Sequence, residues 1–292
     1  MAQKITAALV KQLREMTDSP MMECKKALVE TDGDIEAAVD VLRTRGLAAA
    51  AKKAGRETNE GTIGAYVSEE GTVGALVEVR CETDFVGTNP KFTGFAREVA
   101  KVVVENNPST AEELLALPMG GTTVQEELTE LIHIIKENMK LGRFVRREGN
   151  AVSSYVHLGG KIGVLAEFNL GKAETAAADE FKSFAHDVAM QVAAGAPAVA
   201  ICATRDQVPA EVVEHEKSIY KEQAAQSGKP EEIQERMATG RLEKFYKQTV
   251  LCEQEFIKDS SMTVADYVEK TAKSLDDEIA VAGFERFVLG EE

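Results

Sequence analysis

Apolar side chains recur at helical spacing through the first part of the chain. The pattern predicts three short helices, of which the last ends at Gly46. Residues 47–60 continue first as helix and then as a polar linker. A unit of about 46 residues buries only a small core, which suits a docking module and leaves no room for a deep active site. The clearest apolar stripe has i, i+3, i+4, i+7 spacing and consists of Ile35, Ala38, Val39 and Leu42.

The rest of the chain contains an internal repeat. When the chain is shifted by 89 positions, residues 63–100 align with residues 152–189 without a gap, and 11 of the 38 aligned pairs are identical. Average composition gives about two identities by chance. The sequence therefore contains a duplication. Its identical pairs include Tyr66 with Tyr155, Gly74 with Gly163, Leu76 with Leu165, Phe92 with Phe181 and Phe95 with Phe184.

Each copy has the pattern of strand, tight turn, strand, loop and helix. In the first copy, alternating apolar positions predict strands over residues 62–67 and 73–79, with Gly71 in the turn between them. A third short strand is expected in each copy, at residues 143–145 and 286–288. We expect an α+β, multidomain fold with two similar subdomains, each a small antiparallel sheet covered by helices.

A long insertion interrupts the second copy. Residues 208–226 and 231–248 are rich in Glu, Lys and Ala at helical spacing, and residues 227–230 (SGKP) separate them. We expect an antiparallel helical hairpin at about residues 206–250, which acts either as a structural arm or as a surface for self-association or partner contact. The expected domains are a head with linker over residues 1–56, one core subdomain over residues 57–150 and a second over residues 151–292.

Charge argues against nucleic acid as a direct partner. The chain of 292 residues has 49 acidic and 34 basic residues, a formal net charge of −15, and such a field repels polyanions. The charge is uneven, because residues 1–56 hold ten basic and eight acidic residues, which leaves 24 basic and 41 acidic residues in the remainder.

Composition also predicts the compartment and the lack of a metal or other cofactor. The four cysteines lie far apart without a CxxC motif, which argues against a zinc site or a disulfide framework. The first residues lack the apolar run of a signal peptide, and no stretch of about 18 apolar residues is present to cross a membrane. We expect a cytoplasmic protein with free thiols.

The two copies diverge most in the loop after the second strand. The first copy has residues 80–86 (RCETDFV), whereas the second has residues 169–175 (NLGKAET), which contain no aromatic side chain. Phe85 either packs into the core beneath this loop or protrudes as an apolar anchor beside a carboxylate. A second difference lies in the hairpin turn, where His157 replaces Ser68 and is either an exposed polar residue or a contact.

Together these motifs resemble the bacterial elongation factor Ts family, the guanine-nucleotide exchange factors of elongation factor Tu. The resemblance covers nearly the whole chain in the family's order. The matching segments are residues 21–28 (MMECKKAL), 33–36 (GDIE), 83–86 (TDFV), Tyr155 and His157 ahead of residues 161–165 (KIGVL), 226–230 (QSGKP) and 283–287 (GFERF).

The resemblance implies a head like a ubiquitin-associated domain, two repeated core subdomains, an inserted helical hairpin, and binding to elongation factor Tu, both GDP-bound and nucleotide-free. It implies no catalytic residue. Two departures from relatives affect the core contacts, namely Lys258 and residues 138–145 (NMKLGRFV). The implied partner contacts are Val10, Lys11, Arg14, Met21, Met22 and Lys25 on the head, Thr83, Asp84, Phe85 and Val86 beside the partner's magnesium and nucleotide, and Ile135, His157 and Ile257 on the core.

Three other functions are weighed against exchange. An adaptor that binds ubiquitin-like proteins through the head would leave the repeat unexplained. A hydrolase would need Glu82, Asp84 and His157 to converge from different subdomains, and the chain has no GxSxG, HExxH or phosphate-binding glycine loop. A ribosome or RNA binder is disfavoured by the negative charge.

Overall fold

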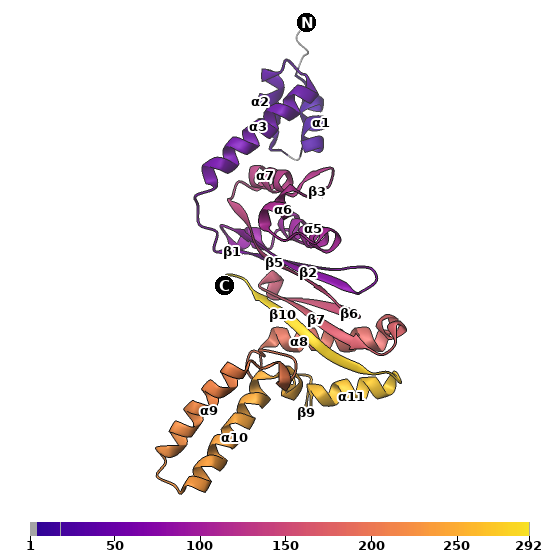
Figure 1. Ribbon diagram of the computed structural model, residues 1–292. Helices are drawn as coiled ribbons and strands as arrows, with labels where there is room; N and C mark the ends of the chain where they lie inside the picture. Colours follow the sequence, from indigo (N-terminus) through magenta and orange to yellow (C-terminus); the bar gives the residue numbers. More distant parts are fainter. Residues whose placement is uncertain (1–4, 18, 292) are drawn as a thin grey trace.

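The computed structural model describes residues 5–17 and 19–291 and has a mixed α+β architecture, as predicted. Eleven α-helices and small antiparallel sheets make up the described part of the chain. The molecule is elongated, with three helices at one end, two stacked sheets in the middle and a helical hairpin at the other end (Figure 1).

The N-terminal end is a three-helix unit, called the head below. It consists of α1 (Ala7–Thr17), α2 (Met21–Glu30) and α3 (Ile35–Lys53). Asp34 caps α3 by accepting a hydrogen bond from the Ala37 amide at 3.0 Å. The three helices meet around one small core, whose fully buried members are Leu13, Cys24, Ala27, Leu28 and Ala38.

The prediction that the third helix ends at Gly46 is wrong. Helix α3 continues through Gly46 to Lys53 and crosses α7 (Val124–Ile135). Gly46 is buried there, and a Cβ at this position would lie 3.4 Å from the Cβ of His133 on α7. The glycine therefore permits a close approach of two helices and does not terminate one. Arg43 and Glu126 join the same two helices at 2.9 Å.

Two three-stranded antiparallel sheets follow, and all predicted strands are present. The first sheet has the order β1 (Glu60–Val67), β2 (Val73–Cys81) and β5 (Met139–Glu148). The second sheet has the order β10 (Ile279–Val288), β7 (Ile162–Leu170) and β6 (Ala151–His157). His157 is the last paired residue of β6, opposite Ile162, so its placement in the turn is corrected. The turn itself is the 3-10 segment η1 (Leu158–Gly160).

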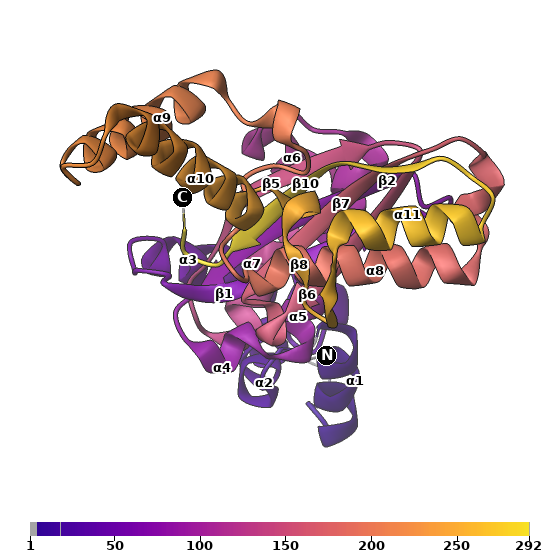
Figure 2. The same ribbon diagram turned by 90° about the horizontal axis from the view of Figure 1, so that it is seen from below.

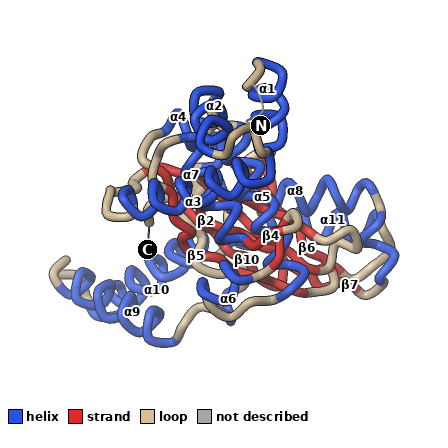
Figure 3. Tube along the Cα trace, turned by 90° about the horizontal axis from the view of Figure 1, so that it is seen from above, coloured by secondary structure: helices blue, strands red, loops and turns tan. Residues whose placement is uncertain are grey.

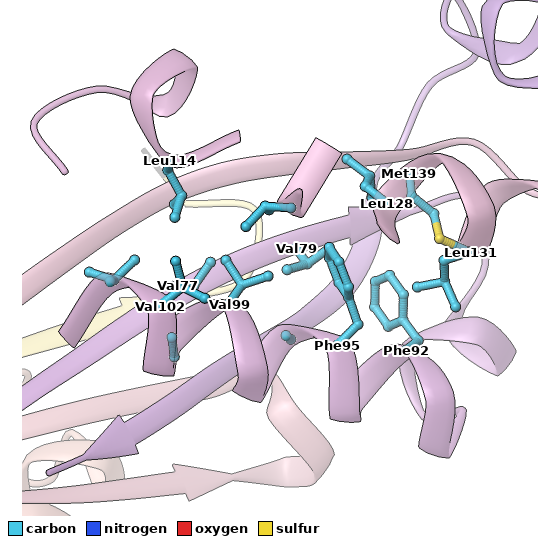
Figure 4. Packing of buried hydrophobic residues seen from close by; sticks show 14 of the residues in the cluster. Val77, Val79, Phe92, Phe95, Val99, Val102, Leu114, Leu128, Leu131 and Met139 are labelled. Carbon is cyan, nitrogen blue, oxygen red and sulfur yellow. The ribbon is translucent and has the colours of Figure 1, made fainter. Parts of the chain in front are cut away.

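Helices cover the outer face of each sheet, so the layers are helix, sheet, sheet and helix (Figure 1). The first sheet is covered by α5 (Pro90–Asn106), α6 (Ala111–Ala116) and α7, with the small pair β3 (Pro118–Met119) and β4 (Thr122–Thr123) beside them. Phe92, Phe95, Val99 and Val102 of α5 point into the core of this half, where Val77 and Val79 of β2 and Leu131 of α7 also lie (Figure 4). The second sheet is covered by α8 (Asp179–Ala194) and α11 (Val264–Ser274), which lie side by side (Figure 2).

The two sheets pack against each other through their inner faces, and their strands overlap when the molecule is seen from above (Figure 3). A Cβ on Gly163 would lie 2.4 Å from a methyl group of Ile63, and a Cβ on Gly74 would lie 2.8 Å from a methyl group of Val152. Glycine at both positions lets the sheets approach closely. The buried residues of this interface are Ile63, Leu76, Val152, Leu165 and Phe287.

The inserted hairpin is present as two antiparallel helices, called the arm below, α9 (Ala210–Ala225) and α10 (Glu231–Thr249). At its base, the Arg205 guanidinium lies over the Tyr246 ring and pairs with Glu243 at 2.9 Å and Glu253 at 2.6 Å. Short elements flank the arm: η3 (Arg205–Gln207), η4 (Leu251–Glu253), β8 (Glu255–Phe256) and β9 (Asp259–Thr263).

Candidate functional site

Phe85 projects into solvent from one turn of helix, α4 (Asp84–Gly87), called the finger turn below. Its side chain is 84% exposed, and Asp84 beside it is exposed as well. Of the two alternatives raised by the sequence, the structure therefore excludes a Phe85 packed into the core. The next residue, Val86, is buried and anchors the turn in the core of the first sheet.

Hydrogen bonds brace the base of the finger turn from a distant part of the chain. The carboxylate of Glu137 accepts from the Thr83 amide at 3.0 Å and from the Thr83 hydroxyl at 2.7 Å. On the other side, the Thr88 hydroxyl donates to the carbonyl of Phe85 at 3.2 Å. The Cys81 thiol donates to the Thr83 carbonyl at 3.1 Å, and burial raises the pKa of this thiol to about 12, so it stays protonated. The turn is thus held firmly while its tip is free.

The repeat shows what the scaffold needs and what the tip adds. Under the 89-residue shift, Val86 corresponds to Thr175, which is also buried, in the 3-10 segment η2 (Ala173–Ala177). Phe85 corresponds to Glu174, which is exposed. Both copies therefore keep a buried anchor, and only the first carries an apolar tip.

His157 lies at the end of β6 and is held by aromatic neighbours. Its Nδ1 is 3.0 Å from the Tyr155 hydroxyl, and the two rings stack with centroids 5.7 Å apart. The Tyr155 ring also makes an edge-to-face contact with the His186 ring on α8, with centroids 5.2 Å apart. The imidazole is half-buried, so it is neither a free polar residue nor a core residue.

The finger turn and the η1 turn after His157 are adjacent, although they belong to different copies of the repeat. A Cβ on Gly159 would lie 3.9 Å from the Thr88 side chain, and one on Gly160 would overlap the Thr62 hydroxyl of β1. A groove of about 540 Å³ runs between these elements, lined by Thr88, Arg97, Val156 and Gly159 among others. The sheet packing therefore brings Phe85 and His157 to one region of the surface.

The other two core residues lie at element ends. Ile135 is the last residue of α7, half-buried and two positions before Glu137, so it lies close to the base of the finger turn. Ile257 is 39% exposed in the loop between β8 and β9, and its amide donates to the Gln191 side chain at 2.8 Å. Lys258, the next residue, pairs with Asp187 of α8 at 2.6 Å.

The head presents five of its six predicted contacts to solvent, namely Lys11, Arg14, Met21, Met22 and Lys25. Val10 differs, because it is 6% exposed and packs in the core of the head. In this conformation it supports α1 and offers little surface, and its contact with a partner stays a prediction.

Sequence reasoning assigned no supporting role to Glu137, Thr88 or Tyr155. Glu137 is 54 positions from Thr83, and no local pattern links the two. Only Tyr155 had a signal, as an identical position of the repeat.

None of the helices in the described part of the chain has the length and apolar character of a membrane span.

The family model and several relatives that match this chain carry the same description. A family model described as elongation factor TS matches residues 82–291. The chain is 47% identical to elongation factor Ts of Trichlorobacter lovleyi, over 98% of this chain and 93% of the relative. It is 46% identical to that of Desulfovibrio desulfuricans and 45% identical to that of Chloroherpeton thalassium, each over 99% of both chains.

Proposed function

The chain belongs to the elongation factor Ts family of translation elongation factors, and we propose that it releases GDP from elongation factor Tu. The observation that carries this proposal is the exposed Phe85 on a braced turn, with Asp84 beside it. A large aromatic ring held in water gains nothing for the fold, whereas it is well suited to fill a pocket of a partner.

Exchange of this kind requires no covalent chemistry. The factor must bind the nucleotide-free partner more tightly than the GDP-bound one, and by linkage it then weakens GDP binding by the same ratio. In the proposed complex, the head and the core bind the partner at two places, and Phe85 enters between the elements that hold Mg²⁺ and the β-phosphate. The Asp84 carboxylate adds a negative charge there, which disfavours the phosphate.

The free energy available from burial of one Phe side chain shows why several contacts must act together. Burial of one Phe contributes about 1.5–3 kcal/mol, and about 1.4 kcal/mol corresponds to a tenfold change in affinity. Phe85 alone can thus shift nucleotide affinity by roughly 10–150-fold. The exposed head residues Met21 and Met22 and the core residues His157 and Ile257 supply further surface for binding.

The test is the release of a fluorescent GDP analogue from purified elongation factor Tu. The chain should accelerate release, and Phe85→Ala should reduce this acceleration by about tenfold or more. Glu174→Ala is the matched control, because it changes the equivalent exposed position of the second copy. Neither variant should change the thermal unfolding midpoint.

Two results would contradict the proposal. If the chain does not accelerate GDP release at any concentration, the function is wrong. If it does so but Phe85→Ala acts like the wild type, the wedge by Phe85 is wrong.

A further inference from the structure

Leu158 is an apolar residue that the fold leaves exposed. It follows His157 in the η1 turn, and its side chain is 66% exposed. Its φ is +50°, in the left-handed region that a branched apolar residue adopts only at a conformational cost. Among the described residues, the other non-glycine positions with positive φ are Asp32, Asn107, Lys136 and Asp276, all of them polar or charged.

The turn geometry does not call for leucine. Glycine adopts positive φ without cost, and the two residues that follow, Gly159 and Gly160, have φ of +64° and +97°. In the first copy of the repeat, the position equivalent to Leu158 is Glu69, which is exposed and polar. Leucine therefore costs backbone energy here and buries little of its side chain in return.

The location of Leu158 places its exposed side chain near Phe85, where it can contact a partner. The η1 turn lies against the finger turn, where a Cβ on Gly159 would be 3.9 Å from the Thr88 side chain. Thr88 caps α4 and bonds to the carbonyl of Phe85. Val156, two residues before Leu158, is 41% exposed and lines the groove between the same elements. Exposed apolar side chains thus gather on both sides of this contact.

We infer that Leu158 is a second apolar anchor for elongation factor Tu, beside Phe85. It fills an apolar depression on the surface of the same partner, next to the one that Phe85 enters, and its position relative to Phe85 is set because both turns contact β1. This inference rests on the proposed function. It adds a binding residue that lies outside the segments on which the family resemblance was based.

The experiment measures both stability and exchange for variants at this position. Leu158→Gly removes the side chain and relieves the backbone, so its thermal midpoint should equal or exceed that of the wild type. The concentration of factor needed for half-maximal GDP release should rise about tenfold or more. Leu158→Asn, which tolerates positive φ but is polar, should show the same loss. Leu158→Met keeps an apolar side chain and should retain most of the activity.

A matched control separates backbone relief from lost contact. Asn107 also has a positive φ, +49°, but it follows the C-terminal end of α5, outside the proposed binding residues. Asn107→Gly should leave exchange unchanged.

The outcomes distinguish this inference from the function on which it rests. If the wild type accelerates release and Phe85→Ala slows it, but Leu158→Gly and Leu158→Asn stay within about twofold of the wild type, Leu158 is no anchor and the proposed function stands. If the wild type itself is inactive, both are overturned. A stable Leu158→Gly with weakened exchange supports the inference, because a purely structural leucine would not separate the two readouts.

Discussion

The brace between Glu137 and Thr83 offers a test of the finger turn that does not need the partner. Glu137→Ala removes two hydrogen bonds to a carboxylate, at 3.0 and 2.7 Å. Bonds to charged groups contribute about 1.5–3 kcal/mol each, and partial exposure reduces this to about 1–1.5 kcal/mol each. The turn should therefore lose about 2–3 kcal/mol of local support, which lowers the ratio of braced to released conformations by roughly 30–150-fold.

Amide hydrogen exchange measures this loss directly. The Thr83 amide donates to Glu137, and those of Gly87 and Thr88 bond back within the turn. In Glu137→Ala these amides should exchange faster, whereas the amides of β7 in the second sheet should be unchanged. Glu174→Ala serves as the control without a brace. The acceleration of GDP release from elongation factor Tu should fall as well, because a released finger turn must be ordered again when the partner binds. Unchanged protection of residues 83–88 would refute the reasoning.

Two further predictions concern the packing that supports the site. Gly163→Ala should destabilise the chain by about 1–3 kcal/mol in urea unfolding, because the new Cβ meets Ile63 at 2.4 Å, and combination with Ile63→Ala should cost less than the sum of the two changes. Burial lowers the pKa of His133, so the unfolded chain binds this proton more readily, and stability should fall as the pH drops through about 6.5. His133→Leu should flatten that fall between about pH 7.5 and 5.5, and an equal slope in the variant would count against this assignment.

Sequence periodicity predicted the elements well where each is decided locally. The strands of both sheets and the two arm helices appear where alternation and helical spacing place them. The end of α3 failed because Gly46 has two meanings. A glycine after an apolar stripe commonly ends a helix, but here it permits contact with His133, a residue 87 positions away. No local pattern separates the two cases.

The exposed tip of the candidate site, Phe85, was predictable from the sequence, whereas the residues that support its turn were not. Phe85 stood out because the second copy of the repeat lacks an aromatic residue there. Its exposure depends on Val86, which takes the buried place beneath the turn. Glu137 could not be found, since its role arises only when the connection between α7 and β5 brings it to the turn from 54 positions away. The burial of Val10 was not predictable, because a residue of an amphipathic helix can face either its own core or a partner.

The duplication explains how two distant turns came to form one surface. Gly74 packs on Val152 and Leu165, and the shift of 89 residues converts this contact into that of Gly163 with Ile63 and Leu76. The two halves thus pack on each other in the manner of an isologous pair, with this glycine contact made twice. Such a scaffold provides two equivalent sets of turn tips. Phe85 and Leu158 occupy one set, whereas Glu174 and Glu69 occupy the other. Substitutions at exposed tips alone therefore distinguish an apolar end, where we propose that the partner binds, from an acidic one, and the buried core that positions both ends needs no change.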